Sequence, residues 1–154
     1  MRSSIVSLTS VLVLLAAIAH AQNVFSDQQA AELIRLAHQN FWGKAKLSTG
    51  QVIQPRDERE RQTLPIPYAD AVRVVQSSVP AGLGAWCSVD WRSYYQAFMK
   101  LERQKPWSEK QIAFICILFG VAQGNLQKAM SKSPCTPKER EGVTKLLAIA
   151  KKRL

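Results

Sequence analysis

The stretch from Ile112 to Ala122 constrains the fold of this chain most, because every residue in it is apolar or glycine. A helix with this sequence has apolar side chains around its whole circumference, so other elements must surround it. The run is about half as long as the roughly 20 residues that cross a bilayer. We therefore expect a central helix over 108–131 in the core of a small globular domain, and no membrane span.

Three capping boxes mark the starts of helices. Each pairs a Ser or Thr with a Gln or Glu three residues later, so that two free backbone N–H groups are satisfied reciprocally. They lie at Ser26–Gln29, Ser108–Gln111 and Thr136–Glu139. Apolar residues at helical spacing follow the first box and predict a helix over 27–42. The third box predicts a last helix that begins near Pro137.

Two further helices are expected between these starts. Apolar residues from Tyr68 to Gln76 indicate a short helix, and an amphipathic pattern predicts another over 89–104. Ser88 or Asp90 would cap the second of these. The stretch Ser77–Gly84 contains two glycines and a proline, which predicts a loop.

The whole chain is thus expected to be all-α, a single domain over 22–154 with about five helices around the central one. Residues 44–66 interrupt this pattern as an irregular segment. Prolines punctuate it, residues 47–53 would form a small hairpin or an ordered loop, and 56–61 alternate in charge as a solvated turn or short surface helix does.

Residues 1–21 resemble a secretory signal peptide. Arg2 supplies the basic start, Val11–Ala19 the apolar stretch, and Ala19-His20-Ala21 a cleavage site with small residues. We expect the signal to be removed and the protein to be secreted or periplasmic.

Export into an oxidising compartment permits a disulfide among Cys87, Cys116 and Cys135. The short turn near Pro106 makes the helices on either side antiparallel. At about 1.5 Å per residue, Cys87 and Cys135 then lie at the same end of this hairpin, whereas Cys116 lies halfway along the apolar helix. The expected bridge joins Cys87 to Cys135, and Cys116 is expected to be a buried free thiol.

Basic residues outnumber acidic ones, with 21 Lys and Arg against 11 Asp and Glu and a formal net charge of +10. This balance favours an anionic partner, either a protein or an acidic cell-envelope surface. Nucleic acid is not expected, because no binding motif is present and the protein is exported. The candidate binding residues are Trp86, Asp90, Arg56, Arg59, Arg61, Lys151, Lys152 and Arg153.

Enzymatic chemistry has weaker support. Cys116 lies in the most apolar stretch, far in sequence from His38, so it lacks the base that a nucleophile requires. No metal or haem spacing occurs, and no cofactor is expected. Paired carboxylates among Asp70, Asp90 and Glu102 leave open a small cell-wall or glycan-active hydrolase. The leading hypothesis is a non-enzymatic binding protein, and the hydrolase is the alternative.

The C-terminal third resembles the small periplasmic helical immunity proteins that neutralise type VI secretion amidases. The shared pattern is a helix with glycines four residues apart, Gly120 and Gly124, then a turn that carries Cys135 and a final amphipathic helix around Val143–Leu147. The resemblance implies an immunity or inhibitor role, in which the partner is another protein.

Overall fold

The structure is a computed structural model that describes residues 24–154, and the predicted signal peptide lies outside the described residues. The described chain is helical without a regular strand, which confirms the expected all-α fold. The helices are α2 (Asp27–Gln39), α3 (Glu58–Gln62), α4 (Tyr68–Ser77), α5 (Val79–Trp86), α6 (Arg92–Glu102), α7 (Glu109–Met130) and α8 (Pro137–Lys152).

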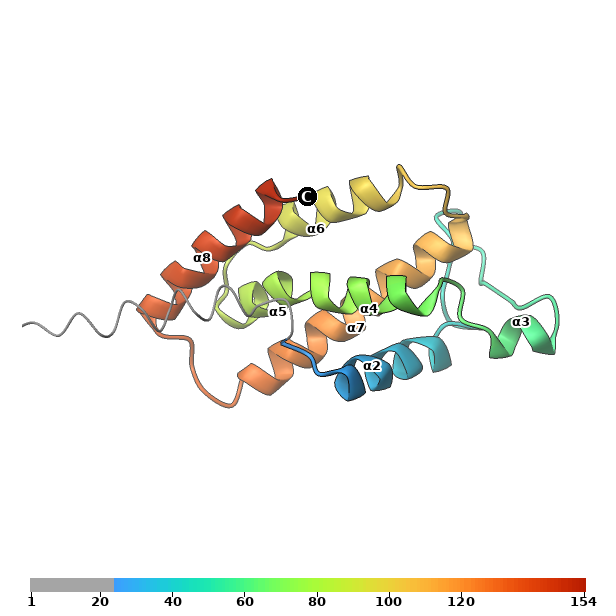
Figure 1. The fold of residues 1–154 in the computed structure, drawn as a ribbon, viewed down its shortest axis with the longest axis horizontal. Helices are drawn as coiled ribbons and strands as arrows, with labels where there is room; N and C mark the ends of the chain where they lie inside the picture. Colours follow the sequence, from blue (N-terminus) through green and yellow to red (C-terminus); the bar gives the residue numbers. More distant parts are fainter. Residues whose placement is uncertain (1–23) are drawn as a thin grey trace, which may run out of the picture.

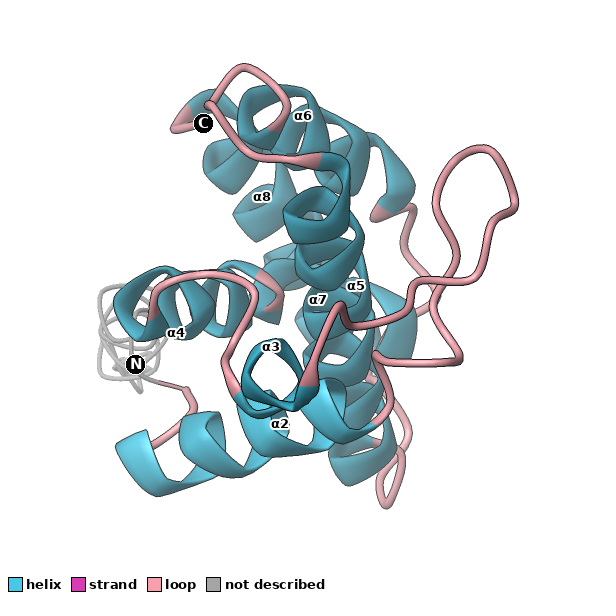
Figure 2. Ribbon diagram, turned by 90° about the vertical axis from the view of Figure 1, so that its right-hand side faces the viewer, coloured by secondary structure: helices cyan, strands magenta, loops and turns pink. Residues whose placement is uncertain are grey.

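The long helix α7 organises the bundle (Figure 1), and it packs against α2, α4 and α5. Helix α8 packs on α5 and α6, so α5 lies between the two groups of helices. Figure 2 shows α6 and α8 together on one side of the molecule and α2 and α4 on the other. All three predicted capping boxes are present, at the starts of α2, α7 and α8.

Only part of the circumference of α7 is buried. Phe114, Ile115 and Leu118 are fully enclosed, whereas Cys116 is half-buried and Gly120 is exposed. By length and composition alone, α7 is a candidate for crossing a membrane, with a mean hydropathy of 1.3 over its most apolar window. Of that window, 33% is buried within the described domain.

The expectation that α7 would be covered on every side is wrong because α6 diverges from α7 beyond the turn that joins them (Figure 1). Aromatic rings bridge the gap between the two helices. The ring of Phe119 lies 4.9 Å from that of Tyr95 and 5.2 Å from that of Phe98, between centroids. One face of α7 is therefore left open.

The loop predicted over Ser77–Gly84 is wrong, because these residues form the end of α4 and most of α5. The glycines of this stretch allow close helix packing. A Cβ atom added to Gly82 would lie 2.9 Å from the Cβ of Leu126 on α7, and one added to Gly84 would lie 3.1 Å from Cδ1 of Leu147 on α8. Glycine at these two positions permits close contact between helices and does not form a turn.

Helix α6 begins at Arg92, later than predicted, and Trp91 is its N-cap residue. Ser88 has a φ of 55°, and the N–H of Val89 donates to the carbonyl of Gly84 at 2.9 Å. This is the Schellman pattern that ends a helix, so these residues complete α5 and cannot cap α6. Of the two predicted caps, Asp90 does contact the start of α6, because its carboxylate accepts a hydrogen bond from the N–H of Arg92, at 3.0 Å.

The expected disulfide between Cys87 and Cys135 is confirmed, with the two Cα atoms 5.1 Å apart. It joins the end of α5 to the connection between α7 and α8. Cys116 is free, as expected, but it is half-buried and not fully enclosed, and its Sγ lies 3.9 Å from Sδ of Met99.

The segment over 44–66 holds one isolated β-bridge and the short helix α3. The bridge joins Lys46 to Val52 around Gly50, which has a φ of 85°. Ile53 and Ile66 are buried and fasten the segment to the core.

We predict opposite effects for two glycine-to-alanine substitutions. Gly82→Ala lowers the free energy of unfolding by about 1–3 kcal/mol, because the new methyl group overlaps Leu126. Gly120→Ala raises it by about 0.5–1 kcal/mol, because this exposed helical position has open space around its Cα. Urea denaturation measures both, and equal effects at the two positions would contradict the packing described for α5.

Candidate functional site

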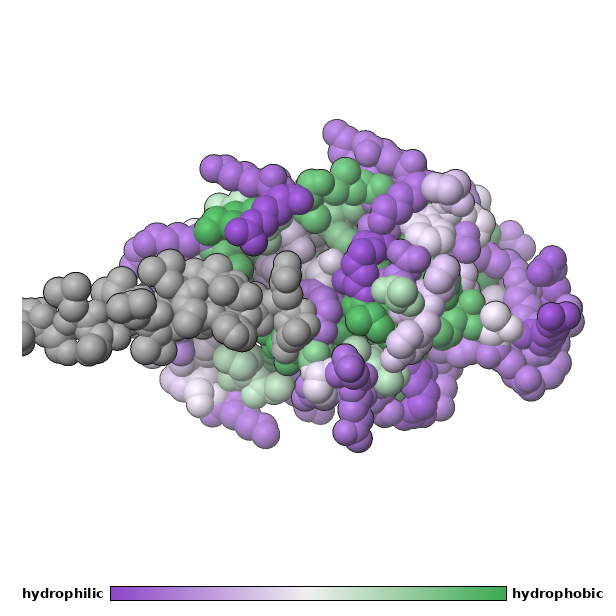
Figure 3. All heavy atoms as spheres, in the orientation of Figure 1, coloured by the Kyte–Doolittle hydropathy of each residue, from purple (hydrophilic) through white to green (hydrophobic). Residues whose placement is uncertain are grey.

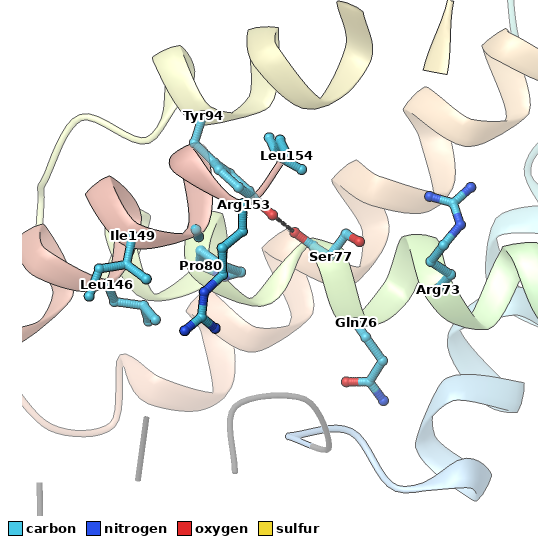
Figure 4. Close-up of a pocket in the computed structure, with 10 residues that line it drawn as sticks. Arg73, Gln76, Ser77, Pro80, Tyr94, Leu146, Ile149, Arg153 and Leu154 are labelled. Carbon is cyan, nitrogen blue, oxygen red and sulfur yellow. Dashed lines mark hydrogen bonds between the residues drawn. The ribbon is translucent and has the colours of Figure 1, made fainter. Parts of the chain in front are cut away.

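A groove runs between the α4–α5 junction and the C-terminal half of α8 (Figure 4), with a volume of about 370 Å³. We call it the α8 groove. Its walls are formed by Arg73, Gln76 and Ser77 of α4, Pro80 of α5 and Tyr94 of α6, and by residues of the last turns of α8.

The apolar wall of the α8 groove comes from α8. Val143 and Leu147 of this helix are buried against the bundle. Leu146 and Ala150 are half-buried beside the groove, and Ile149 follows at its rim. The side chains of Ile149 and Leu154 remain 37% and 39% exposed, which is high for large apolar residues.

The polar side chains of the groove are two arginines, a tyrosine, Gln76 and Ser77. Arg153 reaches across Pro80 in Figure 4, and among residues 24–154 no carboxylate lies within ion-pair distance of it. The hydroxyl of Tyr94 donates to the carbonyl of Ser77 at 2.8 Å. Burial raises the pKa of Tyr94 to about 12, so the phenol stays neutral.

The other guanidinium, that of Arg73, is held by a buried carboxylate. Nη1 and Nη2 of Arg73 contact the two oxygens of Glu102 at 2.8 and 3.0 Å. Lys105 Nζ donates to Glu102 at 3.0 Å, and the indole N–H of Trp107 donates to it at 3.1 Å. Asp70 also contacts Arg73, at 3.3 Å. We call these residues the Glu102 network.

Glu102 is 2% exposed, yet the network keeps it ionised. Burial by itself raises the pKa of Glu102, but the hydrogen bonds from Arg73, Lys105 and Trp107 outweigh burial and hold that pKa below its ordinary value. A general acid in glycoside cleavage needs the opposite, a raised pKa. The network therefore suits Glu102 to a structural role.

Two of the three predicted catalytic carboxylates come together, since Asp70 and Glu102 both contact Arg73. Asp90 lies in a separate hollow beside Trp91. Within the described residues no three His, Cys, Asp or Glu side chains are placed to hold a metal ion.

The predicted binding residues are likewise dispersed. Arg56, just before α3, pairs with Glu60 at 3.3 Å, and Arg61 on α3 pairs with Glu58 at 3.3 Å. Arg59 is exposed on the same helix. Trp86 is half-buried, and its indole N–H donates to the carbonyl of Ser133 at 2.9 Å.

Of the predicted basic tail, Lys151 and Lys152 are exposed in the last turn of α8, and only Arg153 lines the groove. The predicted site residues included neither Ile149 nor Tyr94. The available signal was that Ile149 falls outside the buried stripe of the last helix while remaining large and apolar.

Comparison with protein-family models, curated proteins and solved structures finds no match to the chain. The resemblance to immunity proteins therefore stays a prediction. Gly120 and Gly124, the glycines of that resemblance, do not serve close helix packing here, because a Cβ added at either position would meet nothing within 4 Å.

We predict that Glu102→Gln lowers the free energy of unfolding at pH 7 by about 2 kcal/mol. Breaking a buried ion pair costs about 3–5 kcal/mol, and here the cost is smaller because Arg73 and Lys105 reach solvent. Because the pKa of Glu102 is lower in the folded state than its ordinary 4.5, its contribution is complete above pH 4.5 and is lost as the pH falls through the folded-state pKa.

The difference in the free energy of unfolding between wild type and Glu102→Gln should thus become smaller below pH 4.5. Urea denaturation from pH 7 to pH 3 measures it. Glu58→Gln is the matched control, since Glu58 forms an exposed pair with Arg61. A difference that stays constant over this pH range would contradict an ionised, network-bound Glu102.

Proposed function

We propose that this protein is an exported, non-enzymatic binding protein whose α8 groove docks an acidic protein partner. The observation that carries the proposal is the meeting of Arg153, which has no carboxylate partner within the described chain, with the exposed side chains of Ile149 and Leu154. An immunity or inhibitor role is one version of this function.

An exposed apolar side chain next to an arginine is the usual composition of an interface anchor. Figure 3 shows apolar surface over α8 and the adjacent α6, divided and bordered by hydrophilic side chains. Exposed apolar surface with a polar rim is typical of sites that bind another protein. The groove is concave, so a single protruding side chain of the partner can enter it.

Charge is distributed unevenly along α8. Lys138 and Arg140 balance Glu139 and Glu141 near its start, whereas Lys151 and Lys152 lie in its last turn beside Arg153. Together with the net charge of +10, this pattern attracts an acidic partner toward the groove end of the helix. It also predicts that association slows as the salt concentration rises.

Export is supported by the disulfide between Cys87 and Cys135, since such bridges persist in oxidising compartments. The signal-like sequence of residues 1–21 points the same way. An exported protein meets its partner outside the cytoplasm, so the proposed partner is also secreted or periplasmic.

We predict that Arg153→Glu weakens partner binding, because it replaces the cation of the groove with an anion. The matched control is Lys138→Glu, which makes the same charge change at an exposed position in the first turn of α8. Immobilised wild type, Arg153→Glu and Lys138→Glu are exposed to an extracellular or periplasmic extract of the source cells. The retained protein is then titrated against each by calorimetry.

The expected weakening for Arg153→Glu is at least about 30-fold, equivalent to a hot-spot loss of about 2 kcal/mol, with little change for Lys138→Glu. Equal weakening by both variants would show attraction to net charge alone and would overturn docking in the groove. Capture that neither variant weakens would also overturn it.

A further inference from the structure

A second and larger hollow lies on the open face of α7, with a volume of about 680 Å³. We call it the α7 hollow. Its floor is formed by α7, and its walls are formed by the chain around Leu47 and by the turn between α6 and α7. The floor is uncovered because α6 diverges from α7 beyond that turn.

Three contacts fix the walls of the α7 hollow. The indole N–H of Trp107 donates to the buried carboxylate of Glu102, which holds the ring in place beside the hollow. Across the hollow, the hydroxyl of Ser48 lies 3.5 Å from Oε2 of Glu109 at the start of α7. The bridge between Lys46 and Val52 holds the same wall. These contacts hold the walls of the α7 hollow in place.

The lining combines apolar side chains with two cations. Ile112 and Ile117 of α7 supply the apolar floor. Lys46 and Arg103 are exposed at its edge, and among residues 24–154 neither lies within ion-pair distance of a carboxylate. Glu109 is the one acidic residue of the lining. The hollow therefore carries a net positive charge.

We propose that the α7 hollow binds a small organic anion with an apolar body, of the class of medium-chain carboxylates. Pockets for small molecules occupy roughly 300–1,000 Å³ and combine apolar walls with a few polar groups that orient the ligand. The carboxylate lies between Lys46 and Arg103, and the hydrocarbon chain lies along Ile112 and Ile117. This site is separate from the α8 groove and does not depend on the partner proposed there.

Cys116 makes occupancy measurable. It lines the α7 hollow and is the one cysteine of the three that the disulfide leaves free. A ligand seated on the floor shields its thiol, so the rate of alkylation by iodoacetamide reports binding without any label.

The test compares octanoate with 1-octanol, which has the same chain length and no charge. We expect octanoate to bind wild type at least about tenfold more tightly than octanol by calorimetry, corresponding to about 1.4 kcal/mol. Octanoate should also slow the alkylation of Cys116. The double variant Lys46→Gln, Arg103→Gln should bind octanoate about tenfold more weakly and octanol unchanged.

Lys100→Gln is the matched control, because Lys100 is exposed on α6 and does not line the hollow. Ala113→Leu fills the hollow and should weaken octanoate without any change of charge. Circular dichroism verifies that each variant is folded. Equal affinity for octanoate and octanol, an unchanged rate of Cys116 alkylation, or equal octanoate binding by the double variant and wild type would each overturn the proposal.

Discussion

The carboxylate of Glu102 is the interaction on which the rest of the structure depends. A buried charge is costly unless donors surround it, so the native fold must bring those donors together. Here Arg73 comes from α4, and Lys105 and Trp107 come from the turn that leads into α7. Glu102 thereby joins α4 to the end of α6 and the turn after it, and the contact with Arg73 is the one that is distant in sequence. The desolvation is offset by five hydrogen bonds from these three side chains and by solvent access to the two cations.

Each of the two proposed sites has a wall that Glu102 holds in place. Arg73 lines the α8 groove and Trp107 lines the α7 hollow, and both side chains are held by Glu102. A change in the protonation of Glu102 would therefore loosen one wall of each site. The disulfide between Cys87 and Cys135 acts at the far end of α7, where it holds the connection to α8. The carboxylate and the disulfide thus secure opposite ends of the central helix.

The sequence predicts those features that local chemistry decides. The capping boxes place the starts of α2, α7 and α8, because each depends on residues three positions apart. Helix α5 was not predicted, because the glycine at position 82 is explained only by close packing against Leu126, which is distant in sequence. The role of Glu102 escaped prediction for the same reason, since Arg73 lies 29 positions away. Arg153 was a predicted binding residue, but the groove around it forms only when α8 packs on α5 and α6.

The measurement that tests this account most directly is the titration of the Glu102 side-chain carboxyl carbon by NMR, with the indole N–H of Trp107 followed in the same samples. The account predicts a midpoint below 4.5 for Glu102, because its three donors outweigh burial. It also predicts that the Trp107 N–H signal shifts with the same midpoint, because the two groups share a hydrogen bond. A midpoint above 4.5, or a Trp107 signal that ignores the titration, would contradict the central role of this carboxylate.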